Sequence, residues 1–337
     1  MVNKPPTLKD VAERAGVSSM AVSAVVNNTH STVRLSESTR QRIFRAMSEL
    51  QYRPDMTARS LRLQRTDTIG FYNGHGYIDM SDRYAPTMFM GLQSAVASFH
   101  NHLLLYNGFH LQPEGAIVRK LLGNKADGVV IWPAPADESV IRKVGETQKP
   151  VIQLVDAYPG VASVVTDDYD KARALAEYLS DKGHSRILFR RGFVPLSTEV
   201  TRHRAFLDVA AERGMTVIAT MPLDRLDRLT EFERSLISRN RESEGVTAVA
   251  CWHDLSAVQV VRFLDEQGIR VPDDIALTGF DGFDWAEFAE SRPLTTVAVD
   301  WRGIAVSSVE LLMESIQGHQ IAERTTIPGS LRIGATT

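Results

Sequence analysis

The chain has 337 residues, of which 43% are hydrophobic, and it contains one cysteine. Domains commonly hold about 100–200 residues, so this length predicts two or three domains, and the lone Cys251 excludes an internal disulfide. No apolar run reaches the roughly 18 residues of a membrane span. The first residues also lack the apolar stretch of a secretory signal, so we expect a cytoplasmic protein with no membrane partner.

Charge is distributed unevenly along the chain. The net charge is −3, yet residues 1–65 hold 11 Lys and Arg against 5 Asp and Glu, while the remainder holds 27 basic against 36 acidic residues. A basic head on an acidic body indicates a polyanionic partner for the head alone. A solvated charged surface is an equal alternative on this evidence.

Residues 7–51 predict three short helices. Thr7 and Asp10 have the spacing of a capping box at the start of the first helix, and Gly16 suits a left-handed turn at its end. The second helix follows the cap Ser18 and runs from Ser19 to about residue 27, and the third spans about residues 36–51. Apolar residues at helical spacing predict the buried faces: Leu8, Val11, Ala12 and Ala15; Ala21, Val22, Val25 and Val26; and Ile43, Met47 and Leu50.

Three short helices with a glycine turn between the first two are typical of a helix-turn-helix domain, in which the second helix lies in the major groove of DNA. Hydroxyl and amide side chains on that helix suit phosphates, whereas Met20 and Ala24 suit apolar contact with a thymine methyl group. An ordinary small helical bundle is the alternative. The outward residues of the second helix are Ser18, Ser19, Met20, Ser23, Ala24 and Asn27.

The segment after the third helix predicts a short, weak helix from Pro54 to about residue 62. Isolated helices of fewer than about 12 residues are marginal in water, so this one should order only when it packs on something. Its basic residues are Arg59 and Arg62, and Leu61 is an apolar side chain that could wedge into a minor groove and kink the duplex. A flexible linker is the alternative.

At this point residues 7–62 resemble the head and hinge of the lactose-repressor (LacI/GalR) family. The longest matching string is T-L-x-D-V-A-x-x-A-G-V-S at 7–18, followed by V-S-x-V-V-N at 22–27. Further matches are Thr39-Arg40, Tyr52-x-Pro54 and Ala58-x-Ser60-Leu61. Two features depart from the pattern: Ala24 stands where the family often carries a large polar residue, and the loop at 28–35 is longer than in the shortest members.

The resemblance assigns roles to individual residues of the head. It implies that Ser19, Met20 and Ala24 contact bases and that Leu61 is the wedge. It implies phosphate contacts for Thr7, Ser18, Ser23, Asn27 and Thr39. The complete set of expected DNA-binding residues is Thr7, Leu8, Ser18, Ser19, Met20, Ser23, Ala24, Asn27, Thr39, Tyr52, Asp55, Arg59 and Leu61.

From Thr68 onward, short apolar runs alternate with helix-length segments, which predicts an α/β core of parallel sheets. The expected strands are 68–72, 103–106, 128–132, 151–155, 186–189, 217–219, 248–252 and 275–279. The core also resembles, more weakly, the periplasmic sugar-binding proteins in fold, which implies two lobes joined by three crossovers near 166–169, 296–299 and 324–327. We therefore expect a DNA-binding domain at 1–53, a hinge at 54–66 and a core at 67–337, with lobe 1 at about 67–166 and 298–324 and lobe 2 at about 167–297 and 325–337.

Ligands of open α/β sheets bind beyond the carboxyl ends of the strands, which here predicts a cleft between the lobes. The resemblance makes Arg202 and Asp281 the main effector-binding pair and places His253 and Trp301 in the pocket, although a core or interface role is the alternative for the latter two. Asp156 ends a predicted strand, and a cap is an equal interpretation of it. The full expected set is Asp156, Arg202, His253, Asp281, Trp301 and Tyr84, the last beside Asp82 in a loop that could equally face a dimer contact.

These patterns favour a regulator over an enzyme or a transport receptor. The sequence has no Gly-x-Ser-x-Gly elbow, no phosphate-binding loop and no zinc-like spacing of His and Cys, so we expect no catalytic residue, metal or cofactor. A sugar-binding receptor would share the core but not the basic head. We expect a homodimeric transcriptional repressor that binds a palindromic operator and is controlled allosterically by a small-molecule effector, a sugar.

Overall fold

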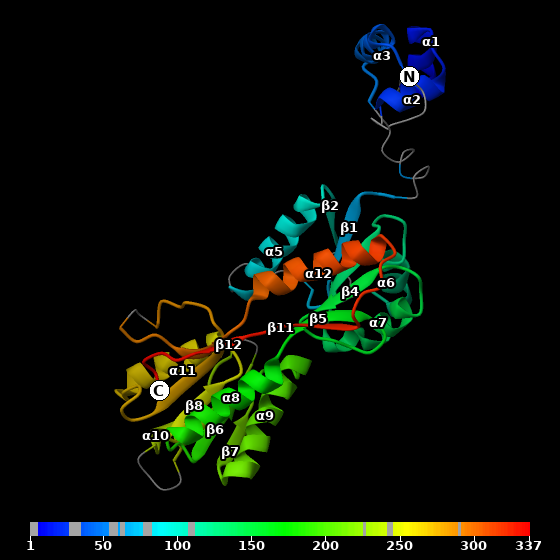
Figure 1. Ribbon diagram of the computed structural model, residues 1–337. Helices are drawn as coiled ribbons and strands as arrows, with labels where there is room; N and C mark the ends of the chain where they lie inside the picture. The colour runs from blue at the N-terminus through cyan, green and yellow to red at the C-terminus, as the bar shows by residue number, and fades with distance from the viewer. Residues whose placement is uncertain are drawn as a thin grey trace. The chain divides into compact units, whose positions relative to one another are not determined.

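The computed structural model describes residues 6–26, 35–53, 60, 65–76, 83–106, 112–224, 227–240, 245–288 and 291–337. They fall into two compact units, Met1–Thr66 and Asp67–Thr337 (Figure 1). None of the described helices has the length and apolar character needed to cross a membrane.

The first unit contains the three predicted helices, α1 (Leu8–Ala15), α2 (Ser19–Val26) and α3 (Glu37–Glu49). The capping box at α1 is confirmed: the Asp10 carboxylate accepts from the Thr7 amide at 2.7 Å, and the Asp10 amide donates to the Thr7 hydroxyl. Gly16 adopts the expected left-handed conformation, with φ +65°. Val11, Val22 and Ile43 are fully buried or nearly so where the three helices meet, and small alanines on α1 and α2 surround them.

The first sheet of the second unit has the strand order β11-β5-β4-β3-β1-β2 and is parallel throughout. Helices α5 and α12 cover one face, and α6 and α7 cover the other. The strands are β1 (Thr68–Asn73), β2 (His102–Tyr106), β3 (Gly128–Trp132), β4 (Val151–Leu154), β5 (Ala162–Thr166) and β11 (Arg324–Ile327). The helices are α5 (Tyr84–Ser98), α6 (Glu114–Leu121), α7 (Glu138–Gly145) and α12 (Trp301–Ile316).

The second sheet has the order β12-β10-β9-β8-β6-β7 and is parallel except for the antiparallel pair β10–β12. Helices α8 and α9 pack on one face, and α10 and α11 pack on the other. The strands are β6 (Arg186–Arg190), β7 (Thr216–Thr220), β8 (Ala248–Cys251), β9 (Ala276–Asp281), β10 (Thr295–Ala298) and β12 (Ser330–Arg332). The helices are α8 (Asp168–Asp181), α9 (Ser197–Arg213), α10 (Glu231–Ser238) and α11 (Asp254–Gln267).

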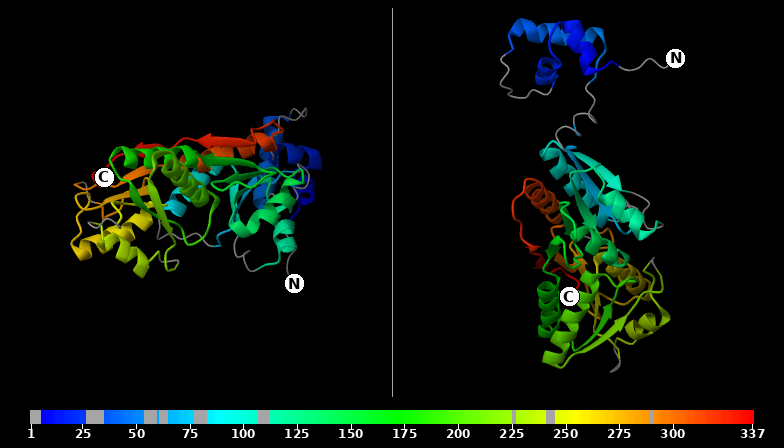
Figure 2. Two further views of the ribbon diagram at one scale, coloured as in Figure 1. Left: turned by 90° about the horizontal axis from the view of Figure 1, so that it is seen from below. Right: turned by 90° about the vertical axis from the view of Figure 1, so that its right-hand side faces the viewer.

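The chain passes between the sheets three times: from β5 to α8, from β10 to α12, and from β11 to β12. Figure 2 shows the C-terminal strands β11 and β12 running along both halves of this unit. The expected change of lobe at residue 324/325 is wrong, because Arg324–Ile327 pair in register with β5 of the first sheet. The third crossover therefore follows Ile327. All eight predicted strands are present with ends within two residues, whereas β5, β10, β11 and β12 were not predicted as strands.

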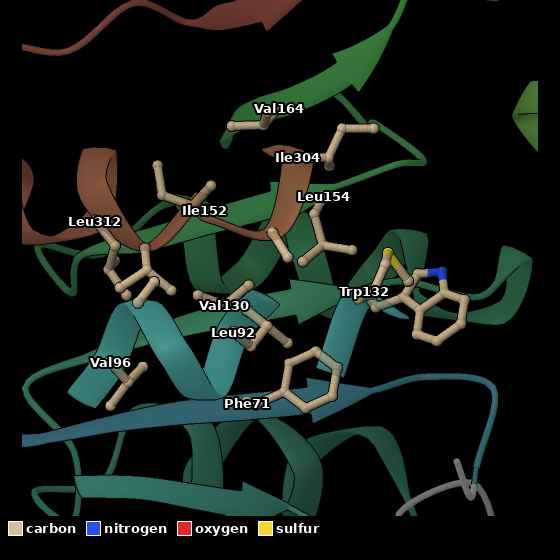
Figure 3. Packing of buried hydrophobic residues seen from close by; sticks show 14 of the residues in the cluster. Phe71, Leu92, Val96, Val130, Trp132, Ile152, Leu154, Val164, Ile304 and Leu312 are labelled. Carbon is tan, nitrogen blue, oxygen red and sulfur yellow. The ribbon is translucent and has the colours of Figure 1, made fainter. Parts of the chain in front are cut away.

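The apolar cluster on one face of the first sheet extends to the carboxyl ends of its strands. Figure 3 shows Phe71, Val130 and Ile304 among the apolar side chains that fill the layer between the sheet and α5 and α12. Trp132, the last residue of β3, lies at one end of this cluster and is 7% exposed. Close packing of these side chains thus fixes the position of the Trp132 ring at the end of β3.

Candidate functional site

A cavity of about 350 Å³ lies between the carboxyl ends of the two sheets. This volume is at the lower end of the roughly 300–1,000 Å³ typical of small-ligand pockets. Its lining comes from both sheets: Asn73, His75, Arg83, Tyr84, Ala85, Trp132, Leu196, Thr198, Arg202, Trp252, His253, Leu255, Asp281, Phe283, Trp285 and Trp301.

The strand order explains why these residues meet. In the first sheet β1 lies between β3 and β2, so the connections from β1 and β3 diverge and leave a crevice at the ends of these two strands. Asn73 ends β1 and Trp132 ends β3. In the second sheet Trp252 directly follows β8, and Asp281 ends the neighbouring strand β9. Both walls of the pocket are therefore built from strand ends.

All four tryptophans of the chain line this pocket. The ring of Tyr84, the first residue of α5, packs edge-on against Trp132 and Trp301, with centroid separations of 5.1 and 4.5 Å. Burial raises the pKa of the Tyr84 hydroxyl well above its usual value, so this group is neutral. The indoles give the pocket broad apolar faces on which a flat ring or the apolar face of a sugar ring can pack.

Several buried N–H groups in the pocket wall make no hydrogen bond to any residue that the structure describes. They are the indole Nε1 atoms of Trp252, Trp285 and Trp301 and the Nδ2 atom of Asn73. An indole N–H can only donate, and an unpaired buried donor costs about 1–3 kcal/mol. The wall is therefore complementary to a ligand that presents several acceptor atoms.

Arg202 forms the ionic part of the second wall. Its Nε donates to Asp168 at 2.6 Å, and its Nη1 donates to the Trp252 carbonyl at 2.7 Å and lies 3.4 Å from Asp281. The guanidinium also lies over the ring of Phe280, 3.7 Å from its centroid. Burial raises the pKa of both carboxyl groups, and Arg202 partly opposes that rise. The side chain is thus held in one position before any ligand arrives.

Another buried carboxylate, that of Asp254, holds the loop that follows Asp281. Asp254, the first residue of α11, accepts from the amides of Gly282 and Phe283 at 2.7 and 2.8 Å and from the Thr296 hydroxyl at 2.6 Å. Burial raises its pKa to about 7, against the lowering effect of these hydrogen bonds. Asp281 itself has φ +118°, a strained conformation for a residue with a side chain. Asp254 therefore stabilises the strained turn that points Asp281 toward the pocket.

His253 both caps α11 and lines the pocket. Its Nδ1 accepts from the Ser256 amide at 3.0 Å and so caps α11, and its ring stacks on Trp252 with a centroid separation of 4.0 Å. Burial lowers its pKa to about 4, so the imidazole is neutral at pH 7. Because Nδ1 accepts, the proton of the neutral ring resides on Nε2.

Five of the six expected effector-site residues line the same pocket: Tyr84, Arg202, His253, Asp281 and Trp301. Asp156 does not line it. Its carboxylate accepts from the Ser197 hydroxyl at 2.5 Å and the Thr198 amide at 3.3 Å, which is the cap interpretation. Asp82 lies outside the described residues. The pocket residues that sequence reasoning missed include Asn73, Trp132, Trp252 and Trp285. The available signal was that Trp132 and Trp252 are the last residues of two predicted strands.

In the first unit the expected DNA-binding residues gather at helix N-termini. Thr7 and Ser18 precede α1 and α2, and Thr39 lies in the first turn of α3. Helix N-termini attract anions through free amides and the helix dipole. Met20 is 70% exposed, as expected for a base-contacting side chain, whereas Ser23 and Ala24 are half-buried. Leu8 and Tyr52 pack partly against the core of this unit. Asn27, Asp55, Arg59 and Leu61 lie outside the described residues.

Comparison with known proteins assigns both units. Residues 7–55 match the bacterial regulatory proteins of the lacI family, and residues 176–337 match the periplasmic binding protein-like domain. The transcriptional regulator GalR of Escherichia coli (strain K12) is 29% identical over 95% of this chain and 92% of GalR. The transcriptional repressor PurR of Photobacterium profundum is 27% identical over 92% of each chain.

Solved structures agree over nearly the full length. The Lac repressor dimer bound to operator and the anti-inducer ONPF has a TM-score of 0.81 at 25% identity and covers 99% of both chains. The Lac repressor bound to ONPG has a TM-score of 0.79 at 25% identity and covers 99% of this chain and 100% of that one. A helix-turn-helix head on a periplasmic-binding-protein-like core defines a DNA-binding transcriptional regulator with an effector-binding core, and not an enzyme. The chain belongs to the LacI family of such regulators.

Proposed function

We propose that this regulator is a cytoplasmic homodimeric repressor that binds a palindromic operator. Its affinity for the operator falls or rises when a sugar binds in the pocket. One observation carries the effector assignment: a ligand-sized cavity holds a pre-positioned Arg202–Asp281 pair opposite apolar rings and unpaired N–H donors. Hydroxyl groups of a sugar can accept from Arg202 and donate to Asp281, and the apolar face of its ring can pack on an indole.

DNA recognition is assigned to the first unit. In this proposal α2 lies in the major groove, with Ser19, Met20 and Ala24 toward the bases. The side-chain hydroxyls of Thr7, Ser18 and Thr39, which lie at helix N-termini, contact phosphates. Two-fold symmetry of a dimer would place two heads on the two halves of a palindrome. The exposed Met20 supports a contact with a thymine methyl group.

The link between the two activities is proposed to be the hinge at 54–66, between a DNA-binding domain at 1–53 and the core at 67–337. A helix this short is marginal alone, so a small change between the lobes can decide whether paired hinge helices pack. A coupling free energy of roughly 1–3 kcal/mol would change operator affinity about 5–150-fold.

A selection from randomised duplex DNA on immobilised full-length protein tests the proposal. We expect enrichment of one palindromic sequence, with an affinity that falls steeply as salt rises. A protein that enriches no sequence would contradict it.

Leu61→Ala should weaken binding to the selected operator more than to random DNA. Equal losses on both would refute the wedge assignment.

A further inference from the structure

We infer that the effector is a sugar ring that carries one negatively charged group, a carboxylate or a phosphate, held at the mouth of the pocket by Arg83. This inference rests on the proposed effector role of the same pocket and names its ligand class. It follows from three features of the wall: one guanidinium with no carboxylate partner among the described residues, an excess of donors, and space for a single substituted ring.

The charges of the lining residues are unequally paired. Arg202 already lies within hydrogen-bonding distance of two carboxylates, Asp168 and Asp281, so it has no positive charge to spare. Arg83 lines the same pocket and forms no ion pair with any described residue. Its guanidinium lies over the ring of Trp285, 5.5 Å from the centroid, which holds the cation beside the pocket without neutralising it. A ligand anion is the partner that this arrangement lacks.

The hydrogen-bonding groups of the pocket also favour an anionic ligand. Within the described part of the chain, three indole N–H groups and the Asn73 side-chain NH2 group are buried and unpaired, and each of these nitrogens can only donate. Asn73 is 7% exposed and Trp301 is 2% exposed, so solvent cannot satisfy them fully. Carboxylate and phosphate oxygens only accept, so an acidic ring offers more acceptors than its neutral counterpart of the same shape.

The two ends of such a ligand have different places in the pocket. Asp281, which lines the second wall, and Asp168, which is bonded to Arg202, would repel an anion buried deep in the cavity, but Asp281 can accept from ring hydroxyls. Arg83 is exposed and immediately precedes α5, so it stands at the solvent side of the lining. We therefore place the neutral hydroxyls toward Asp281 and the anionic group toward Arg83, with the ring between the indoles.

Matched pairs of sugars test this assignment on the full-length protein. The probes are galacturonate against galactose, glucuronate against glucose, and the corresponding 6-phosphates. Binding is followed by intrinsic tryptophan fluorescence, because all four tryptophans line the pocket. At least one acidic sugar should bind about twofold to fivefold more tightly than its neutral partner, the change expected for one partly exposed charge pair. This preference should shrink as salt rises. Carboxylates and phosphates form separate arms that distinguish the two sources of charge.

Arg83→Gln should abolish the preference, so that the acidic and the neutral sugar of a pair bind this variant with equal affinity, and Arg83→Lys should restore most of the preference. Arg142→Gln is the matched control, because it removes an exposed arginine from α7 of the same sheet layer, outside the pocket. Equal affinity for both members of every pair, no binding by any probe, or a preference that survives Arg83→Gln would each overturn the inference. Acidic binding that leaves operator affinity unchanged would support the ligand class but contradict the proposed regulation, whereas release by a neutral sugar alone would do the reverse.

Discussion

The two walls of the pocket are built on different principles. The wall from the first sheet is aromatic: Tyr84, Trp132 and Trp301 pack edge to face, and Asn73 beside them keeps an unpaired amide. The wall from the second sheet is ionic, and Arg202 is bonded to Asp168 and close to Asp281 before any ligand binds. The guanidinium of Arg202 thus has its partners within the protein, whereas indole N–H groups on both walls have none among the described residues and are left for a ligand.

This difference separates two contributions to binding. A pre-paired ionic wall loses little freedom when the ligand arrives, and it sets orientation. An aromatic wall with unpaired donors gains the most from the ligand, because each new hydrogen bond removes a penalty that the empty pocket carries. Substitutions in the ionic wall should therefore affect folding and binding together, while substitutions of N–H donors should affect binding nearly alone.

The largest effect is expected from Arg202→Ala. It leaves two buried carboxylates without their cation, which should cost about 3–5 kcal/mol of unfolding free energy and weaken effector binding more than 100-fold. Denaturant unfolding and tryptophan fluorescence titration measure the two losses. Arg190→Ala is the matched control, since Arg190 is fully buried with Glu233 and Asp227 but does not line the pocket.

The control should lose comparable stability and change effector affinity by less than about threefold. If both variants bind effector normally, Arg202 is structural and the site lies elsewhere. Operator affinity without effector should be unchanged in both folded variants, because the DNA-binding assignments lie in the first unit.

An intermediate effect is expected on the pH dependence of stability. The pKa of Asp254 is raised to about 7, so its contribution is fully present below its unfolded value near 4 and is lost as pH rises toward 7. The pKa of His253 is lowered to about 4, so its contribution is present above its unfolded value near 6.5 and is lost as pH falls toward 4. The two slopes oppose each other in the same window.

Asp254→Asn and His253→Asn should therefore change the pH profile in opposite directions. Between about pH 4 and 7, stability should rise more steeply with pH in Asp254→Asn and fall more steeply in His253→Asn, relative to wild type. Urea unfolding at a series of pH values measures this. Parallel profiles in all three proteins would mean that neither group is desolvated as described.

The smallest effect is expected from Trp285→Phe, which removes an unpaired indole N–H but keeps an aromatic face. One lost hydrogen bond predicts about 2–10-fold weaker effector binding, with unfolding free energy changed by less than about 1 kcal/mol. Trp285→Leu, which also removes the ring, should bind more weakly still. Unchanged affinity in Trp285→Phe would show that this indole contributes shape rather than a donor.

Local patterns were sufficient for the head. The capping box of Thr7 and Asp10, the turn at Gly16 and the apolar spacing of α1 to α3 depend on residues close in sequence, so the helices could be predicted from them. Buried strands of the core were equally visible as apolar runs. Strands β5, β10, β11 and β12 were not, because β11 and β12 are half exposed and β5 and β10 have polar residues among the apolar ones.

The pocket likewise contains some residues that could be predicted from the sequence and others that only the tertiary structure brings together. Resemblance was enough to select Arg202, Asp281, His253 and Trp301, and a place at a strand end selected Tyr84. That same criterion could not exclude Asp156, whose cap on α9 involves residues about 40 positions away. Nor could it bring Trp132, Trp252 and Trp285 together, because two sheets and the three crossovers between them place these side chains in one cavity. The pairing of charges is equally nonlocal, because the folded core decides which carboxylates lie near each arginine. Among the described residues, Arg202 has two carboxylate partners and Arg83 has none.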